Sequence, residues 1–205
     1  MWGNIAIAFL LACIVSFMMT PYSIRLAKKL GALDVPKDDR RMHGKTMPKL
    51  GGVAVIVGFL VASIYLFCIM SIEGTIDLFG EELYFKKLTG IFLGIIIITI
   101  VGMADDIKTL KPYQKLIGQL LAATVVVLFG VQIEHINVPM IAQIGLTKEF
   151  SVLLTIIWIV AITNAINLMD GLDGLSSGIT LISCISLLII FALNYSPIVS
   201  ILIIT

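Results

Sequence analysis

Six long apolar runs dominate this sequence and restrict what it can fold into. A bilayer with a hydrocarbon core about 30 Å thick is crossed by a helix of roughly 20 apolar residues. Runs of that order lie near residues 2–24, 51–72, 88–104, 116–133, 150–169 and 175–193. They lack the alternation of a membrane barrel, and a helix satisfies its own backbone hydrogen bonds in lipid. Because 59% of the residues are hydrophobic, the sequence predicts an all-α, polytopic transmembrane helix bundle that forms one integral membrane domain over residues 1–205.

A seventh apolar segment begins after Pro197. Residues 198–205 would form a helix of only about 12 Å at 1.5 Å per residue, which is too short to cross the bilayer. We therefore expect six complete spans plus a truncated seventh, in a chain that is incomplete at its C-terminus.

Lys and Arg are concentrated in alternate connecting segments. Of the 14 basic residues, eight lie between positions 25 and 49, and Lys108, Lys111 and Lys115 follow the third run. The positive-inside rule then places these segments and the end of the fifth run in the cytosol, with the N-terminus outside. Residues 2–24 lack a basic n-region and are expected to be a retained anchor. The external connectors 73–87 and 134–149 are expected to be short, with some strand.

Asp105 and Asp106 close the third run. A carboxylate near lipid costs several kcal/mol and is a functional candidate for that reason. Two adjacent acids at a helix C-terminus repel each other and are disfavoured by the helix dipole, and a cation would relieve both effects. A pair of hard oxygen ligands suits Mg²⁺ held together with substrate phosphates. The alternative is an ordinary charged helix end.

Four side chains with oxygen atoms recur every three residues from the fifth run into a glycine-bearing turn: Asn164, Asn167, Asp170 and Asp173. A step of three residues drifts by about 60° on a helix, so the four cannot share one face, and the turn at Gly171 must regroup them. Gly171 and Gly174 let a ligand approach the backbone. The pattern favours a nucleotide or metal site. The alternative is interhelical hydrogen bonding by the two amides beside a solvated acidic turn.

The basic loop before the second run is the third polar element. It contains His43, Lys45 and Lys49 and ends in Gly51-Gly52, where the free N–H groups of a helix start favour phosphate. Lys45 or Lys49 could neutralise a phosphate, and the sequence does not select between them. A juxtamembrane basic stretch can also be a topology signal or attract anionic headgroups.

Together these elements resemble the polyprenyl-phosphate N-acetylhexosamine-1-phosphate transferase superfamily. It includes the bacterial phospho-N-acetylmuramoyl-pentapeptide transferase and the enzymes that start teichoic acid and O-antigen. Asp105-Asp106 matches the paired aspartates, and the segment from Asn164 to Gly174 matches the Asn-Leu-x-Asp-Gly-Leu-Asp-Gly signature. The segment from His43 to Gly52 matches the first cytosolic loop. Its Met-Pro-Lys-Leu-Gly-Gly departs from the Thr-Pro-Thr-Met-Gly-Gly typical of the muramoyl-pentapeptide branch, which favours the N-acetylglucosamine-1-phosphate branch.

The resemblance implies an enzyme that transfers an N-acetylhexosamine 1-phosphate from a UDP-sugar to undecaprenyl phosphate and releases UMP, with Mg²⁺ or alternatively Mn²⁺. Asp105 and Asp106 would be catalytic and organise the metal ion or the lipid phosphate, and Asn167 and Asp170 would be further metal ligands. The implied substrate-binding residues are His43, Lys45, Lys49, Gly51, Gly52, Asn164, Gly171, Leu172 and Asp173. The implied location is the bacterial inner (plasma) membrane, with the active site on the cytosolic face.

The partners implied are undecaprenyl phosphate, a UDP-N-acetylhexosamine and the lipid bilayer, with no nucleic acid; a homodimer is left open. Family members usually continue through further spans and a later loop with another catalytic aspartate and a His/Arg-rich segment. Nothing here corresponds to these, so we expect this chain alone to be inactive. The rival interpretations are a non-catalytic membrane scaffold and a transporter, although a transporter places its ionisable residues nearer the midplane.

Overall fold

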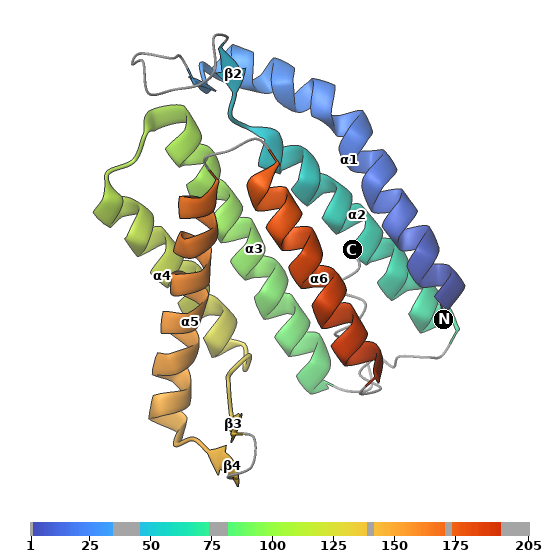
Figure 1. The fold of residues 1–205 in the computed structure, drawn as a ribbon, viewed down its shortest axis with the longest axis vertical. Coiled ribbons are helices and arrows are strands. Elements are labelled where there is room, and N and C mark those ends of the chain that lie inside the picture. The colour runs from blue at the N-terminus through green and yellow to red at the C-terminus, as the bar shows by residue number, and fades with distance from the viewer. Residues whose placement is uncertain (1, 35–45, 74–81, 139–141, 171–173, 194–205) are drawn as a thin grey trace. The chain divides into compact units, whose positions relative to one another are not determined.

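The structure is a computed structural model that describes residues 2–34, 46–73, 82–138, 142–170 and 174–193. Within these ranges it contains six helices and two short antiparallel ladders (Figure 1). The elements are α1 (Trp2–Leu30), β1 (Leu33–Asp34), β2 (Met47–Pro48), α2 (Gly51–Ile72), α3 (Glu82–Lys108), α4 (Pro112–Leu128), β3 (His135–Val138), β4 (Ala142–Gly145), α5 (Lys148–Met169) and α6 (Leu175–Leu193).

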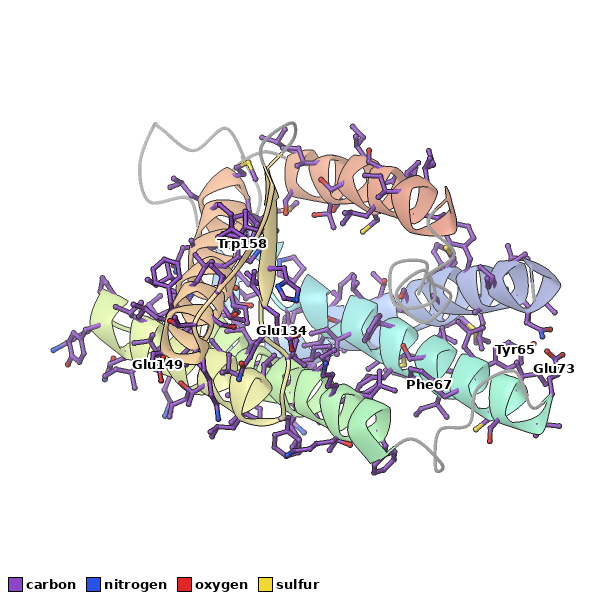
Figure 2. All side chains as sticks on the ribbon, turned by 90° about the horizontal axis from the view of Figure 1, so that it is seen from below. Tyr65, Phe67, Glu73, Glu134, Glu149 and Trp158 are labelled. Atoms are coloured by element: carbon purple, nitrogen blue, oxygen red, sulfur yellow. The ribbon has the colours of Figure 1, made fainter. Side chains whose placement is uncertain are left out.

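Four of these helices are long and apolar enough to cross a membrane: Gly3–Leu30, Gly51–Ile69, Phe85–Lys108 and Lys148–Met169. Their outer faces are apolar as well. On α5, for example, Phe150, Leu153 and Trp158 are each more than half exposed. Trp158 is labelled in Figure 2. Contiguous apolar surface of this kind is stable in lipid and not in water. The predicted class is therefore confirmed: the chain is an all-α, multi-pass membrane protein.

The predicted span count and orientation remain expectations. α4 and α6 are apolar but shorter, with α4 only 17 residues long. The predicted run 116–133 ends early, at Leu128, because Gly130 takes a left-handed conformation with φ of 91°. The seventh segment after Pro197 lies outside the described residues.

The predicted first span was too short. α1 continues from the expected end at residue 24 to Leu30, so Arg25, Lys28 and Lys29 lie on the helix and not in the following loop. Their long side chains can follow an apolar helix while keeping the charge near water, and basic residues in a last turn are favoured by the helix dipole. Gly31, with φ of 72°, ends the helix.

The chain divides into two compact units. The first combines residues 1–77, 103–109 and 177–205, and the second combines residues 78–102 and 110–176. α3 contributes its last turns to the first unit and the rest of its length to the second. Each unit is described separately below.

In the first unit, α1 and α2 pack through small residues. Ala8 and Ala12 of α1 and Ala54, Ala62 and Ser63 of α2 are buried. At Gly58 the helices approach so closely that an added Cβ would meet Ser16 Oγ and would lie 2.7 Å from the backbone oxygen of Ala12. Asn4 Nδ2 donates to Glu73 Oε1 (2.8 Å) at the far ends of the two helices, with Glu73 visible in Figure 2. Small residues permit this approach, which gives van der Waals packing where lipid removes the hydrophobic drive.

Between α1 and α2, the described part of the connecting loop closes on itself. β1 pairs with β2, so that Leu33 lies opposite Pro48 and Asp34 opposite Met47. Lys49 N donates to Ala32 O (3.0 Å), and the Ser23 hydroxyl donates to the Leu50 carbonyl. These bonds attach the start of α2 to the end of α1.

In the second unit, glycines bring α3 and α4 together. Cβ atoms added at Gly90 and Gly94 of α3 would meet Phe129 and Val126, and one at Gly118 of α4 would lie 2.5 Å from Val101 Cγ2. The β3–β4 ladder joins α4 to α5, with Ile136 opposite Ile144. This ladder confirms the predicted strand in the connector 134–149. The other connector, 73–87, is described only at its ends, and its residues from Glu82 onward are helical.

Candidate active site

The acidic pair lies on the last two turns of α3, inside the helix and not beyond it as the predicted span end at residue 104 implied. Asp105 and Asp106 are both half-buried. Met103 and Ile107, which flank the pair, pack against a buried cluster of Ala27, Ala32 and Leu50. At 100° per residue, Asp105 lies about 180° from the direction of this cluster and Asp106 about 80° from it. The apolar contact therefore fixes the helix rotation that turns Asp105 away from the core.

The backbone just after the pair is strained. Thr109 N donates to Asp105 O (2.7 Å), and Thr109 has φ of 45°. A β-branched residue is uncommon in this left-handed region, and such conformations are enriched at functional sites. This tight closure follows directly after Lys108, the last residue of α3.

The same cluster holds the start of α2. Leu50 is 1% exposed and occupies the N-cap position, where it offers no side-chain hydrogen bond to the first turn. Gly51 and Gly52 follow, both exposed, and Cβ atoms added to either would meet nothing within 4 Å. Because Met103 and Ile107 pack against the cluster that contains Leu50, the Gly51-Gly52 helix start and the Asp105-Asp106 helix end belong to one unit. Two of the three predicted elements thus meet.

Of the predicted loop cations, only Lys49 is described. Its side chain is half-buried, and its backbone is held by Ala32. His43 and Lys45 lie outside the described residues.

The third element belongs to the second unit. Asn164 and Asn167 lie on α5, and Asp170 is the exposed residue that caps the C-terminus of this helix. Gly171, Leu172 and Asp173 lie outside the described residues. Gly174 has φ of 78°, which a glycine adopts without strain, and α6 begins directly after it.

Both asparagines form hydrogen bonds with α4. Lys115 Nζ donates to Asn167 Oδ1 (2.8 Å). Asn164 Nδ2 donates to Gln119 Oε1 (2.6 Å), and Gln119 Nε2 donates to Asn164 Oδ1 (3.2 Å). For Asn164, interhelical bonding, the alternative left open by the sequence, is therefore what the structure contains.

Lys115 and Gln119 are additions to the predicted residues. The sequence identified Lys115 only as one of the basic residues that set the orientation, and it did not identify Gln119. One signal in the sequence could have found them: they are four residues apart on an apolar helix, which puts two polar side chains on one face.

The donor chemistry fits a hard divalent cation. The candidate ligands Asp105, Asp106, Asn167 and Asp170 all offer oxygen atoms, which Mg²⁺ prefers. Among the described residues, no group of three or more His, Cys, Asp or Glu side chains is placed to hold a metal ion. A metal ion at the acidic pair would therefore need further oxygen ligands.

A protein-family model matches more than half of this chain. The family model for glycosyl transferase family 4 matches residues 88–205, which include the acidic pair and the asparagine-rich turn. The chain belongs to glycosyl transferase family 4.

This chain is similar to three proteins with different names. A probable undecaprenyl-phosphate N-acetylglucosaminyl 1-phosphate transferase of Bacillus subtilis (strain 168) is 34% identical over 93% of this chain and 49% of that protein. A decaprenyl-phosphate N-acetylglucosaminephosphotransferase of Mycobacterium leprae (strain TN) is 32% identical over 91% of this chain and 46% of that protein. A phospho-N-acetylmuramoyl-pentapeptide-transferase of Latilactobacillus sakei is 31% identical over 72% of this chain and 45% of that protein. The chain spans about half the length of these relatives.

Proposed function

We propose that this protein transfers N-acetylglucosamine 1-phosphate from UDP-N-acetylglucosamine to undecaprenyl phosphate and releases UMP. The observation that carries the proposal is the 34% identity, over 93% of this chain, to the Bacillus subtilis protein named for that activity. The Mycobacterium leprae relative is named for the same sugar phosphate on a different polyprenyl carrier. The product would begin a cell-surface glycan such as teichoic acid or O-antigen.

The proposed reaction exchanges one diphosphate for another. An oxygen of the lipid phosphate attacks the sugar-proximal phosphorus, a new P–O–P bond forms, and the bond to UMP breaks with its electron pair leaving on the UMP oxygen. A phosphate monoester has its second pKa at about 6, so the lipid phosphate is largely dianionic at neutral pH and needs no dedicated base. Catalysis then comes from positioning and charge neutralisation.

The residues divide into three roles. Asp105 and Asp106, with Asn167 and Asp170, would hold Mg²⁺, with Mn²⁺ as a substitute. The ion would neutralise charge on the diphosphate as it is exchanged. The open helix start at Gly51-Gly52 supports the second role, phosphate binding, because N-terminal N–H groups favour anions.

His43, Lys45 and Lys49 would add positive charge to this phosphate site. In the third role, Gly171, Leu172 and Asp173 would face the uridine. The proposal requires that these groups act on the same substrate, with the site on the cytosolic face of the inner membrane.

The substrate is tested by radiolabelled transfer. Membranes that contain the full-length protein, and not residues 1–205 alone, are incubated with Mg²⁺, undecaprenyl phosphate and a panel of UDP-sugars. We expect labelled lipid and UMP from UDP-N-acetylglucosamine. Exclusive use of the muramoyl-pentapeptide nucleotide would refute the choice of sugar.

The site is tested in the full-length protein by Asp105→Asn and Asp170→Asn, which keep the side-chain size and remove the charge. We expect UMP release to fall at least about 100-fold in each variant, since removal of one preorganised charge-stabilising group typically costs about 10²–10³ in turnover. Glu134→Gln and Glu149→Gln are matched controls outside the proposed site, because Glu134 directly precedes β3 and Glu149 lies in the first turn of α5, at the opposite end of that helix from Asp170 (Figure 2). Retained Mg²⁺-dependent turnover in the aspartate variants would remove these residues from the mechanism.

A further inference from the structure

The side chains of Gln119 and Asn164 form two reciprocal hydrogen bonds between α4 and α5. Gln119 is 2% exposed. Asn164 Nδ2 donates to Gln119 Oε1 (2.6 Å) and also to Val160 O of its own helix (2.8 Å). An amide nitrogen carries two hydrogen atoms, so both donors of Asn164 are used within the protein. Asn164 therefore has no donor left to offer a substrate.

The orientation of this amide is fixed by its partners. If the Asn164 amide were turned over, Oδ1 would face the Val160 carbonyl, and two acceptors would be in contact. The same change would put two nitrogen donors against each other at Gln119. The reciprocal pair has one favourable arrangement, which makes it directional in a way that apolar contacts are not.

The pair lies one helical turn from the contact between Lys115 and Asn167. Lys115 and Gln119 are four apart on α4, while Asn164 and Asn167 are three apart on α5, so each pair of side chains shares a helix face. The two contacts are thus successive links between antiparallel helices. A slide of one residue along α5 moves a side chain by about 1.5 Å, which is enough to break the 2.8 Å bond from Lys115 to Asn167.

We propose that Gln119 and Asn164 are positioning residues, whose amide pair sets the register of α4 against α5 and thereby presents Asn167 and the adjoining Asp170 to the diphosphate. This assignment rests on the proposed function. It moves Asn164 from substrate binding, the role expected from the sequence, to control of helix register. One turn after Gln119 on α4, Ala122 and Ala123 are buried and small. Small side chains allow close approach but do not select one axial position.

The test is a side-chain exchange. Gln119→Asn and Asn164→Gln each change the combined length of the pair by one methylene, whereas the double variant restores it. We expect each single variant to lower kcat at least about tenfold while the KM for the UDP-sugar stays within about threefold. The double variant is expected to return kcat to within about threefold of the original protein.

Two neighbouring threonines provide matched controls. Thr124 Oγ1 donates to Leu120 O on α4, and Thr163 Oγ1 donates to Ile159 O on α5. Thr124→Ala and Thr163→Ala remove a hydrogen bond within one helix and leave the helix register alone. We expect turnover within about twofold of the original for both, and the unfolding temperature in detergent is recorded for every variant.

Three outcomes would overturn the proposal. Single variants that raise KM without lowering kcat would return Asn164 to substrate contact. A double variant that regains the original unfolding temperature but not its turnover would show that the pair only stabilises the helices. Equal loss in the threonine controls would remove the specificity for register.

Failure of the proposed function gives a different result. The exchange is assayed with whichever UDP-sugar the original protein uses, so a different sugar refutes the choice of N-acetylglucosamine and leaves the kcat comparison intact. An original protein that uses no UDP-sugar refutes the proposed function, and the positioning proposal falls with it.

Discussion

The α1–α2 pair and the α4–α5 pair are both antiparallel helix contacts, yet they are held by different means. α1 and α2 meet through Gly58 and a series of buried alanines. α4 and α5 meet through the side chains of Lys115, Gln119 and two asparagines. Small residues allow close van der Waals packing, which has no preferred direction. Polar side chains form directional hydrogen bonds, and these can fix the position of neighbouring site residues. The candidate site residues at the end of α5 adjoin the polar contact.

Gly58→Leu is expected to have the largest effect, because it attacks the contact that has no room to adapt. The added Cβ would meet Ser16 Oγ and the backbone of Ala12, and backbone cannot move aside as a flexible side chain can. Overpacking costs typically 1–3 kcal/mol, and we expect a loss of about 3 kcal/mol or more for a side chain of this size. Reversible unfolding in mixed detergent micelles measures it.

Gly102→Ala is the control for that variant. A Cβ at this helical position meets nothing within 4 Å, so we expect a gain of about 0.5–1 kcal/mol from the better helix propensity of alanine. If Gly58→Leu were tolerated as well as Gly102→Ala, close packing would not be what holds α1 to α2.

Changes to the Gln119–Asn164 contact between α4 and α5 are expected to affect stability and turnover differently. Gln119→Leu leaves the Asn164 amide without its partner, which we expect to destabilise by about 1–2 kcal/mol. The double variant Gln119→Leu, Asn164→Leu removes both polar groups and should recover most of that stability, because paired apolar replacements can be nearly neutral. UMP release should stay low in both variants, since both lack the directional hydrogen bonds that set the register of α4 against α5.

Recovery of turnover in the double leucine variant would show that the contact between α4 and α5, like that between α1 and α2, does not depend on polar side chains. Such a contact would need only close packing, and the contrast between the two helix pairs would disappear.

Ser23→Ala tests a polar contact in the first unit, between α1 and the residue that precedes α2. Ser23 is 6% exposed and donates to the Leu50 carbonyl beside Gly51. We expect a loss of about 1 kcal/mol and weaker nucleotide binding, because the start of α2 loses one attachment to α1. Isothermal titration with UMP and Mg²⁺ measures the binding, and Ser186→Ala on α6, whose hydroxyl donates to Ile182 O of the same helix, is the control.

Thr109→Gly is expected to have the smallest effect and the opposite sign. Glycine adopts φ of 45° without strain, so the variant should gain about 0.5–1 kcal/mol. Thr99→Gly, inside α3, should lose about 1 kcal/mol because glycine weakens a helix interior. A stability loss at Thr109 would show that the end of α3 is held by the threonine side chain and not strained by it.

The class of the protein and the identity of its polar elements follow from the sequence. Long Ile, Leu and Val runs must be helices in lipid, and acids beside them must be used. Asp105-Asp106 and the Asn164–Gly174 segment could therefore be selected without coordinates. The bounds could not, because hydropathy does not report where Arg25 to Lys29 extend a helix or where Gly130 ends one.

The sequence could not predict which polar side chains contact each other, and the reason is physical. A glutamine in an apolar helix has no single preferred partner, and only the helix rotation decides that Gln119 meets Asn164. The same holds for the acidic pair, which Met103 and Ile107 orient by packing on Ala27, Ala32 and Leu50. The sequence by itself determined a membrane helix protein and selected its candidate oxygen ligands, since local composition and spacing suffice for that. Only the tertiary structure decided which polar side chains bind each other and which remain to face a ligand, because helix packing sets those directions.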